Sequence, residues 1–387
     1  MSDSIINSFP GYEYVVNRNE DGSFSAHNMY RGTDLGFGGY VYSEPGAYEQ
    51  VALIDASGMH PASIVNMNKL GKYTQRYADL RQARVYIKHH DYESASKLFD
   101  GKLAKYLTDE KEADALSKAL KLPCNSFYGI SSATFSNPAR DSRDKNNIIA
   151  LRGALFMRTL QDEIEEHGGH IIAIRTDSCK IPNATPELIK FVQDFGAKYG
   201  YEMEHECTYE KMCLVDKSSY IAKYDKYGIR NKGGKHPGEW TATASKFQVP
   251  YVFKTLFTKE PLIFDDYCEI KEVKRPYAMY LDMNEGLEPD RHSYHFVGGV
   301  GQFTPVKEGY GGGLLVKTQD RETYAAVTGT LKTNKEKTPY RWMESEVIRS
   351  LKLERPDEMV DKSYYISQVD KAVKEISKYC DFEWFCS

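Results

Sequence analysis

The chain has 387 residues and a formal net charge of −4, with 41% hydrophobic and 27% charged residues. These values are ordinary for a folded globular protein of two or three domains, and they exclude a disordered or fibrous chain. The longest apolar runs, such as residues 51–54 and 170–174, have the length of a strand, and the start lacks a basic segment before an apolar one. We therefore expect neither a membrane-spanning helix nor a secretory signal.

Residues 1–50 are rich in Gly, Tyr and Ser, with weak alternation of apolar and polar side chains. This composition predicts short strands and loops. Gly38 and Gly39, flanked by aromatic residues, come shortly before the first strong strand, residues 51–54.

Asp55 ends the strand of residues 51–54 and is followed by a short turn and Pro61, where a helix is expected to begin. A polar group at the end of a buried strand most often only starts a turn. The other interpretation is that the strand displays the carboxylate of Asp55 for chemistry, with His60 in the turn beside it.

Two helices are expected over residues 73–97 and 109–128, joined around Asp100 as a helical hairpin. On the first helix, Arg84 and Lys88 are four residues apart and so share one face. Two cations on one face can bind an anion, although a solvated helix surface is the simpler explanation for them.

Residues 121–129 read KLPCNSFYG and contain the most informative spacing in the chain. Lys121, Asn125 and Tyr128 follow one another at intervals of four and three, so a helix presents them on one face. Such a face offers a charge to a triphosphate and a flat ring to a base. The structural alternative is an ordinary helix C-terminus, with Gly129 as the helix-ending residue.

A second carboxylate is expected in a tight turn between two strands. A helix is predicted over residues 146–167, and the stretch 170–181 then reads as strand, turn and strand, with Asp177 in the turn. Arg175 comes two residues before it. Residues 185–199 form the next predicted helix, which begins at a Thr-Pro pair.

Between Lys211 and Lys246 there are eight Lys or Arg residues against three Asp or Glu, a local excess of +5. Aromatic residues are interleaved with them, which is typical either of a nucleic-acid-binding surface or of a solvated face. Lys217 and Tyr220 lie in a predicted strand at residues 214–222, and Glu206 lies on a predicted strand before it.

The C-terminal third is predicted to be helical at residues 246–258, 341–353 and 362–380, with a glycine-rich β region in between. The glycines do not form a phosphate-binding P-loop, because no Gly-Lys-Ser/Thr follows them.

Taken in order, the motifs of residues 37–245 resemble those of family B DNA polymerases. Asp55 stands in motif A, residues 121–129 match the K-x-x-x-N-S-x-Y-G motif of the fingers helix, and Asp177 stands in motif C. Lys217 and Tyr220 resemble the strand that follows the primer phosphates. This chain departs from the family pattern where Gly58 replaces Ser and His60 replaces Tyr in motif A, and where Arg175 replaces the first acid of motif C.

The resemblance implies an α+β fold in the shape of a right hand, with an antiparallel-sheet palm, helical-hairpin fingers and a mixed α/β thumb region. The implied boundaries are an N-terminal loop region with the first palm segment at 1–61, fingers at 62–130, palm at 131–238, and thumb with the glycine-rich α/β region at 239–387.

The resemblance also implies a DNA-directed DNA polymerase that adds deoxynucleotides to a primer by two-metal phosphoryl transfer. Two Mg²⁺ ions, or Mn²⁺ as a substitute, would be held by Asp55, Asp177 and the backbone carbonyl of Ala56, with Glu206 as a further candidate ligand. The implied nucleotide-binding residues are Arg84, Lys88, Lys121, Asn125, Tyr128 and His60, and the implied primer or template contacts are Gly38, Gly39, Lys217 and Tyr220. The family's Tyr at the position of His60 lies under the sugar and excludes a 2′-hydroxyl.

Only 54 residues precede Asp55, and they hold no D-x-E acid pair, so no 3′–5′ exonuclease is expected in this chain. The short spacing between motifs suggests a phage-like polymerase, whose partners would be primed template DNA, deoxynucleoside triphosphates and a separate exonuclease or other replication proteins. Seven scattered cysteines without a C-x-x-C pair favour a reducing compartment, hence a cytoplasmic location, that of the bacterial host if the chain is phage-encoded.

Two alternatives remain open from the sequence. The first is a non-catalytic nucleic-acid-binding subunit that kept the shape of a polymerase, which Arg175 and Gly58 favour. The second is a primase-like polymerase that starts chains unaided, for which no residue speaks directly.

Overall fold

The computed structural model describes residues 8–133, 135–137, 147–226, 237–283, 293–317, 324–327, 333–334 and 340–387. Contacts group the chain into two compact units. The first unit comprises Met1–Lys217 and Ala222–Glu239, and the second comprises Ser218–Ile221 and Trp240–Ser387. Helices and antiparallel sheets occur in both, so the expected α+β class with antiparallel sheets is confirmed.

The first unit is built on an antiparallel sheet whose central strands run in the order β8-β5-β7-β6-β4. The strands are β4 (Val41–Ser43), β5 (Gly46–Ala56), β6 (Ala173–Arg175), β7 (Ser178–Pro182) and β8 (Met203–Leu214). Beside β8 lies β9 (Tyr220–Tyr224), whose last residues belong to this unit. The expected strand at residues 51–54 and the strand–turn–strand at 170–181 are both confirmed.

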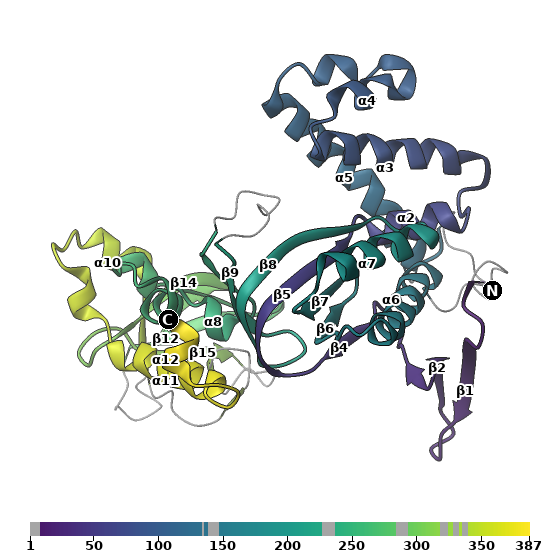
Figure 1. Cartoon of the computed structure of the whole chain (residues 1–387). Coiled ribbons are helices and arrows are strands. Elements are labelled where there is room, and N and C mark those ends of the chain that lie inside the picture. Colours follow the sequence, from purple (N-terminus) through teal and green to yellow (C-terminus); the bar gives the residue numbers. More distant parts are fainter. Residues whose placement is uncertain are drawn as a thin grey trace. The chain divides into compact units, whose positions relative to one another are not determined.

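Two long helices cover one face of this sheet, α6 (Ile148–Glu166) and α7 (Pro186–Lys198) (Figure 1). Ile54 of β5 and Cys179 of β7 belong to the same buried cluster as the apolar side chains of these helices. Because side chains alternate along a strand, Asp55, which follows Ile54, points to the opposite face of the sheet. Thr185 begins α7 as expected, with its hydroxyl accepting a hydrogen bond from the Leu188 N–H at 3.2 Å.

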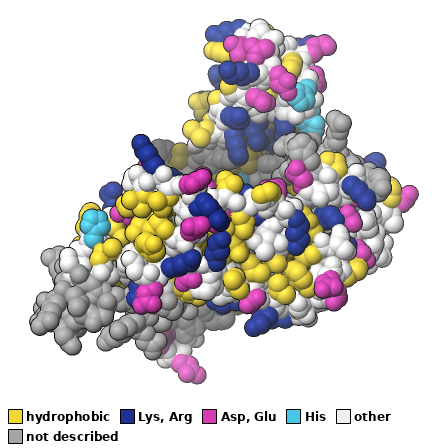
Figure 2. Space-filling model, turned by 90° about the vertical axis from the view of Figure 1, so that its left-hand side faces the viewer, with side chains coloured by type: hydrophobic (Ala, Val, Ile, Leu, Met, Phe, Trp, Pro, Cys, Tyr) yellow, Lys and Arg dark blue, Asp and Glu magenta, His cyan; other side chains and the backbone are white. Residues whose placement is uncertain are grey.

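A helical hairpin projects from this unit (Figure 1). Its helices are α3 (Thr74–Lys88), α4 (Tyr92–Lys97) and α5 (Glu110–Ser132), and the shorter α2 (Met59–Asn66) precedes them. Acidic side chains are interspersed with the Lys and Arg side chains that the hairpin exposes (Figure 2). Asp109 caps α5 by accepting a hydrogen bond from the Glu112 N–H at 2.9 Å.

Two details of the hairpin differ from the sequence-based expectation. The single helix predicted over residues 73–97 is broken, because His90 adopts a φ of 59° and Asp91 starts α4 by accepting a hydrogen bond from the Ser94 N–H at 3.0 Å. The alternative that Gly129 ends its helix is wrong, since α5 continues to Ser132.

Before the central sheet, a small antiparallel sheet contains β1 (Glu13–Arg18), β2 (Phe24–Tyr30) and β3 (Thr33–Asp34), as the short-strand prediction required. The buried Tyr30 hydroxyl lies 3.1 Å from the Thr159 hydroxyl on α6, which ties this sheet to the core.

The second unit contains two antiparallel sheets and short helices. One sheet has the order β11 (Glu269–Glu272), β14 (Val300–Val306), β18 (Arg341–Glu344). The other has the order β13 (Tyr294–Gly298), β12 (Met279–Asp282), β15 (Gly313–Lys317), β16 (Tyr324–Val327), β17 (Thr333–Asn334). The strand β10 (Trp240–Ala242) and the helices α8 (Ser245–Gln248), α9 (Pro250–Phe253), α10 (Ser345–Ser350), α11 (Lys362–Ile376) and α12 (Phe382–Cys386) complete it.

Two of the three helices predicted in this region need correction. Residues 341–344 form β18 rather than a helix, because they pair with β14 and bury Trp342. The helix predicted at 246–258 is divided at Val249, after which Pro250 starts α9 and a π-helical turn, Lys254–Thr258, follows. The helix predicted at 362–380 is confirmed as α11.

Two glycines of the glycine-rich region allow backbone segments to approach each other. A Cβ on Gly312 would lie 2.0 Å from the Asp282 carbonyl oxygen, and one on Gly311 would lie 2.2 Å from that of Trp342. These glycines therefore serve packing within the unit. No helix among the described residues is long and apolar enough to cross a membrane, and all seven cysteines are free thiols.

Candidate active site

The two carboxylates singled out by sequence are neighbours in the first unit: Asp55 lies on β5, and Asp177 lies in the turn between β6 and β7. Asp55 is the penultimate residue of β5 and stands across from Ser178 on β7 and from Glu204 on β8. The Ala56 N–H donates a hydrogen bond to the backbone carbonyl of Asp177 at 2.8 Å. This backbone hydrogen bond between β5 and the β6–β7 turn therefore holds Asp177 beside Asp55.

The electrostatics of this site show an excess of negative charge. Burial, together with the nearby Asp177 and Glu206, raises the pKa of Asp55 to about 8. Burial, together with Glu206, also raises the pKa of Asp177. Lys88 acts in the opposite direction on the pKa of Asp55. Carboxylates that are difficult to ionise together fit a divalent cation, whose charge would remove their repulsion.

Glu206 is placed near Asp55 and Asp177 by a shift in the pairing register between β5 and β8. Leu53 of β5 pairs with Cys207 of β8, whereas the next residue, Ile54, pairs with His205. The register shift leaves Glu206 without a partner across β5. Extra residues of this kind re-aim side chains and are frequent beside active sites.

The turn that carries Asp177 is supported by the segment containing Gly38 and Gly39. Thr176 has a φ of 56°, and its N–H donates a hydrogen bond to the Tyr40 carbonyl at 3.0 Å. A Cβ on Gly39 would lie 2.5 to 2.7 Å from the Thr176 side chain, whereas a Cβ on Gly38 would meet nothing within 4 Å. Only Gly39 is therefore required by packing.

Gly39→Ala is expected to displace Thr176 and with it the neighbouring Asp177, because the added methyl group overlaps the Thr176 Cβ as well as its branches. We expect a loss of about 1–3 kcal/mol in the free energy of unfolding, measured by denaturant titration. Gly38→Ala is the matched control and should stay within about 0.5 kcal/mol of the wild type. Equal effects of the two substitutions would contradict the packing role of Gly39.

The cations predicted to bind a triphosphate occupy two helices. On α3, Arg84 is half-buried with its Nε lacking a hydrogen-bond partner among the described residues, and the Lys88 Nζ lies 3.3 Å from a Glu204 carboxylate oxygen. On α5, Lys121 and Asn125 are exposed. No ion pair or hydrogen bond of the described residues joins Lys121 or Asn125 to the carboxylates.

His60 and Tyr128 form a stacked pair, with ring centroids 4.0 Å apart and an interplanar angle of 16°. The Tyr128 hydroxyl accepts a hydrogen bond from the Asn147 side chain at 3.1 Å. Burial lowers the pKa of His60, and its Nδ1 has no hydrogen-bond partner among the described residues. The imidazole is therefore neutral at physiological pH and presents a flat ring at the start of α2.

Arg81 was missed by the sequence analysis, although it precedes Arg84 by three residues and so shares its face of α3. Its guanidinium donates a hydrogen bond to the Ser57 carbonyl at 2.9 Å and lies 3.8 Å from Glu202. Arg81 therefore fixes α3 to the turn that follows Asp55.

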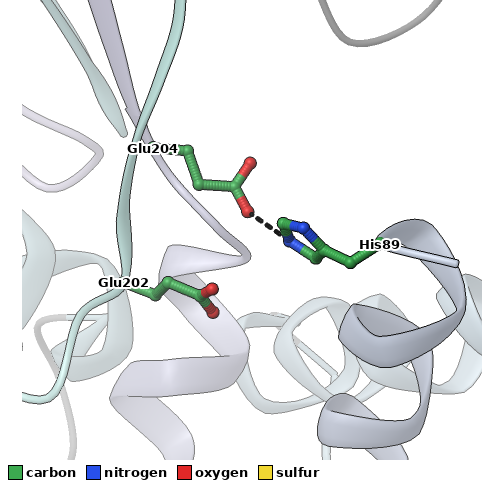
Figure 3. Close-up of side chains that lie close together, drawn as sticks. All are labelled: His89, Glu202 and Glu204. Carbon is green, nitrogen blue, oxygen red and sulfur yellow. Dashed lines mark hydrogen bonds and ion pairs between the residues drawn. The ribbon is translucent and has the colours of Figure 1, made fainter. Parts of the chain in front are cut away.

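A further group that was missed contains His89, Glu202 and Glu204 (Figure 3). Their potential metal-ligating atoms all lie within 4.8 Å of one another. Glu204 is on β8 and Glu202 comes directly before this strand, and their spacing of two could have indicated a shared face. In this structure the two carboxylates already have basic partners. Glu204 pairs with Lys88 and His89, and Glu202 pairs with Arg81.

Two of the predicted primer-contacting residues, Lys217 and Tyr220, lie where the chain passes from the first unit into the second. Lys217 is exposed after β8, and the Tyr220 N–H donates a hydrogen bond to the Thr243 hydroxyl at 3.1 Å. The strand predicted over residues 214–222 is interrupted, because β8 ends at Leu214 and β9 begins at Tyr220. Arg230, Lys232 and Lys235 of the basic stretch lie outside the described residues.

No family model and no curated protein matches this sequence. Among solved structures, the chain is similar to the family B DNA polymerase from the hyperthermophilic archaeon Pyrobaculum calidifontis, with a TM-score of 0.44 and 13% sequence identity. The similarity covers 88% of this chain and 46% of that polymerase, so this chain spans about half of its length. The likeness is distant.

Proposed function

We propose that this protein is a template-directed DNA polymerase that adds deoxynucleotides to the 3′ end of a primer. The observation that carries the proposal is the proximity of Asp55 on β5 to Asp177 in the β6–β7 turn, in a site with excess negative charge. The order of the motifs in the sequence, which resembles that of family B DNA polymerases, indicates the class of reaction, nucleotidyl transfer. The polymerase right hand, with fingers at 62–130, palm at 131–238 and thumb at 239–387, is part of the proposal.

The site fits divalent cations because burial and the neighbouring carboxylates oppose ionisation of Asp55. Asp55, Asp177 and the Ala56 carbonyl would hold two Mg²⁺ ions, which Mn²⁺ could replace, and Glu206 is a candidate for a further ligand. When bound, the ions supply activation of the primer hydroxyl and stabilisation of the pyrophosphate leaving group.

The remaining residues bind and orient the substrates. Arg84, Lys88 and Lys121 would neutralise the triphosphate, and Asn125 and Tyr128 would lie beside the nascent base pair. The contacts proposed for the primer and template are Gly38, Gly39, Lys217 and Tyr220. A preformed His60–Tyr128 stack supports this arrangement, since it supplies a flat apolar surface between motif A and α5.

The direct test is primer extension on a primed DNA template with Mg²⁺ and all four deoxynucleoside triphosphates. Extension that requires both the template and the divalent ion is expected. Binding of primed DNA without any extension would instead support a non-catalytic nucleic-acid-binding subunit. The exposed Arg175, at the position of the first motif C acid, favours this second candidate. Product on an unprimed template would reveal a primase-like enzyme.

His60 is expected to influence the choice between ribonucleotides and deoxyribonucleotides. An imidazole is smaller than a phenol and can form hydrogen bonds, so it should reject a 2′-hydroxyl less strictly than Tyr does. We expect His60→Tyr to lower the ratio of ribonucleotide to deoxyribonucleotide incorporation by about tenfold. We expect His60→Ala to raise the ratio. An unchanged ratio in both variants, measured by single-nucleotide incorporation kinetics, would refute this role.

A further inference from the structure

The C-terminal end of α3 is held against β8 by one buried carboxylate. The Lys88 Nζ lies 3.3 Å from one oxygen of Glu204, and the His89 Nε2 lies 3.2 Å from the other. Figure 3 shows the Glu204 side chain reaching from β8 to His89 at the end of the helix. The Glu204 side chain is only 9% exposed, so it depends on these basic partners for compensation of its charge.

Glu204 also belongs to the electrostatic surroundings of the proposed catalytic acids. It stands directly across from Asp55 in the sheet and raises the pKa of Asp55, whereas Lys88 lowers it. Lys88 is therefore a counter-charge for the carboxylates in the ligand-free protein, as well as the proposed partner of a triphosphate.

An ammonium is a compact point charge, so Lys88 cannot neutralise Glu204 and a phosphate fully at the same time. A triphosphate carries more negative charge than one carboxylate and would compete for Lys88. Arg81, two turns earlier on α3, is fixed to the Ser57 carbonyl at 2.9 Å. The Lys88 end of the helix can therefore exchange partners while its middle stays attached through Arg81.

We propose that Glu204 is a positioning residue that holds Lys88 and His89 when no nucleotide is bound, and that an incoming triphosphate takes Lys88 from it. This inference rests on the proposed function. Glu204 therefore weakens nucleotide binding, because a nucleotide must displace the existing ion pair between Glu204 and Lys88 before α3 can bind it.

The test is a double-mutant cycle on nucleotide affinity with Glu204→Gln and Lys88→Met. Glutamine keeps the shape of the side chain and removes its charge. We expect Glu204→Gln to tighten equilibrium binding of a deoxynucleoside triphosphate, measured with primed DNA and the non-reactive ion Ca²⁺, by about three- to tenfold. The same substitution in a Lys88→Met background should change the affinity by less than about twofold. Glu93→Gln is the control, since it removes an exposed ion pair with Lys97 on α4, and should have no effect.

Equal tightening in both backgrounds would overturn the proposal, because it would show general repulsion by Glu204 rather than competition for Lys88. Unchanged affinity in Glu204→Gln would overturn it as well. Hydrogen exchange of the free protein separates this inference from the proposed function. Faster exchange in the last turn of α3 in Glu204→Gln, and not in Glu93→Gln, is expected even if no polymerase activity exists. Unchanged exchange would show that Glu204 does not hold the helix.

Discussion

Asp177→Ala is expected to abolish Mg²⁺-dependent primer extension, with a loss of at least about 10³-fold in rate, and to leave binding of primed DNA within about threefold of the wild type. Asp177 is held beside Asp55 by the hydrogen bond that the Ala56 N–H of β5 donates to the Asp177 carbonyl in the β6–β7 turn. That bond uses backbone atoms, so the substitution removes the carboxylate and preserves the turn. Single-turnover extension and equilibrium DNA binding measure the two quantities separately.

The control for this experiment is Asp194→Asn on α7, which removes an exposed carboxylate paired with Lys190 in the same unit. Extension by this variant should equal that of the wild type. Full activity of Asp177→Ala would exclude a metal-binding role for this residue and would also remove the main support for the proposed reaction. Loss of extension together with loss of DNA binding would indicate misfolding, which circular dichroism would detect.

Asp55→Asn is expected to stabilise the protein in buffer without divalent ions, even though it should inactivate the enzyme. The pKa of Asp55 is raised from 3.8 in the unfolded chain to about 8 in the folded protein. A carboxyl group whose pKa is raised by folding stabilises the folded protein at a pH below its pKa in the unfolded chain. This stabilisation is lost as the pH rises through its pKa in the folded protein. The amide carries no charge, so the advantage of the variant should be absent below about pH 4 and complete above about pH 8.

The size of this effect is on the order of a few kcal/mol, which corresponds to a gain of about 5 °C in Tm at pH 8.5. Added Mg²⁺ should raise the Tm of the wild type and should have little effect on Asp55→Asn, because bound metal stabilises the folded state in proportion to its affinity. Asp114→Asn, which removes an exposed carboxylate on α5, is the control. A variant that is less stable than the wild type at pH 8.5 would show that Asp55 has a compensating partner.

Local patterns in the sequence predicted much of the first unit. The apolar run at residues 51–54 and its terminal Asp55 appear as the end of β5, and the Thr185–Pro186 pair begins α7. These features depend on side-chain periodicity and capping within a few residues, which is why one sequence suffices to find them. The break at His90 was missed because no helix-breaking Pro or Gly marks it.

The composition of the site depended on strand pairing between residues far apart in the sequence. The spacing of Lys121, Asn125 and Tyr128 predicted their common helix, yet it did not predict that Tyr128 would stack on His60. Likewise, no local pattern indicates that Glu204 stands across from Asp55, or that a shift in register frees Glu206 to approach the aspartates. The sequence by itself therefore determined most of the helices and strands of the first unit and where most of the candidate residues lie along them. Only the tertiary structure decided which charges meet, because register and helix docking are chosen by the packing of the whole core.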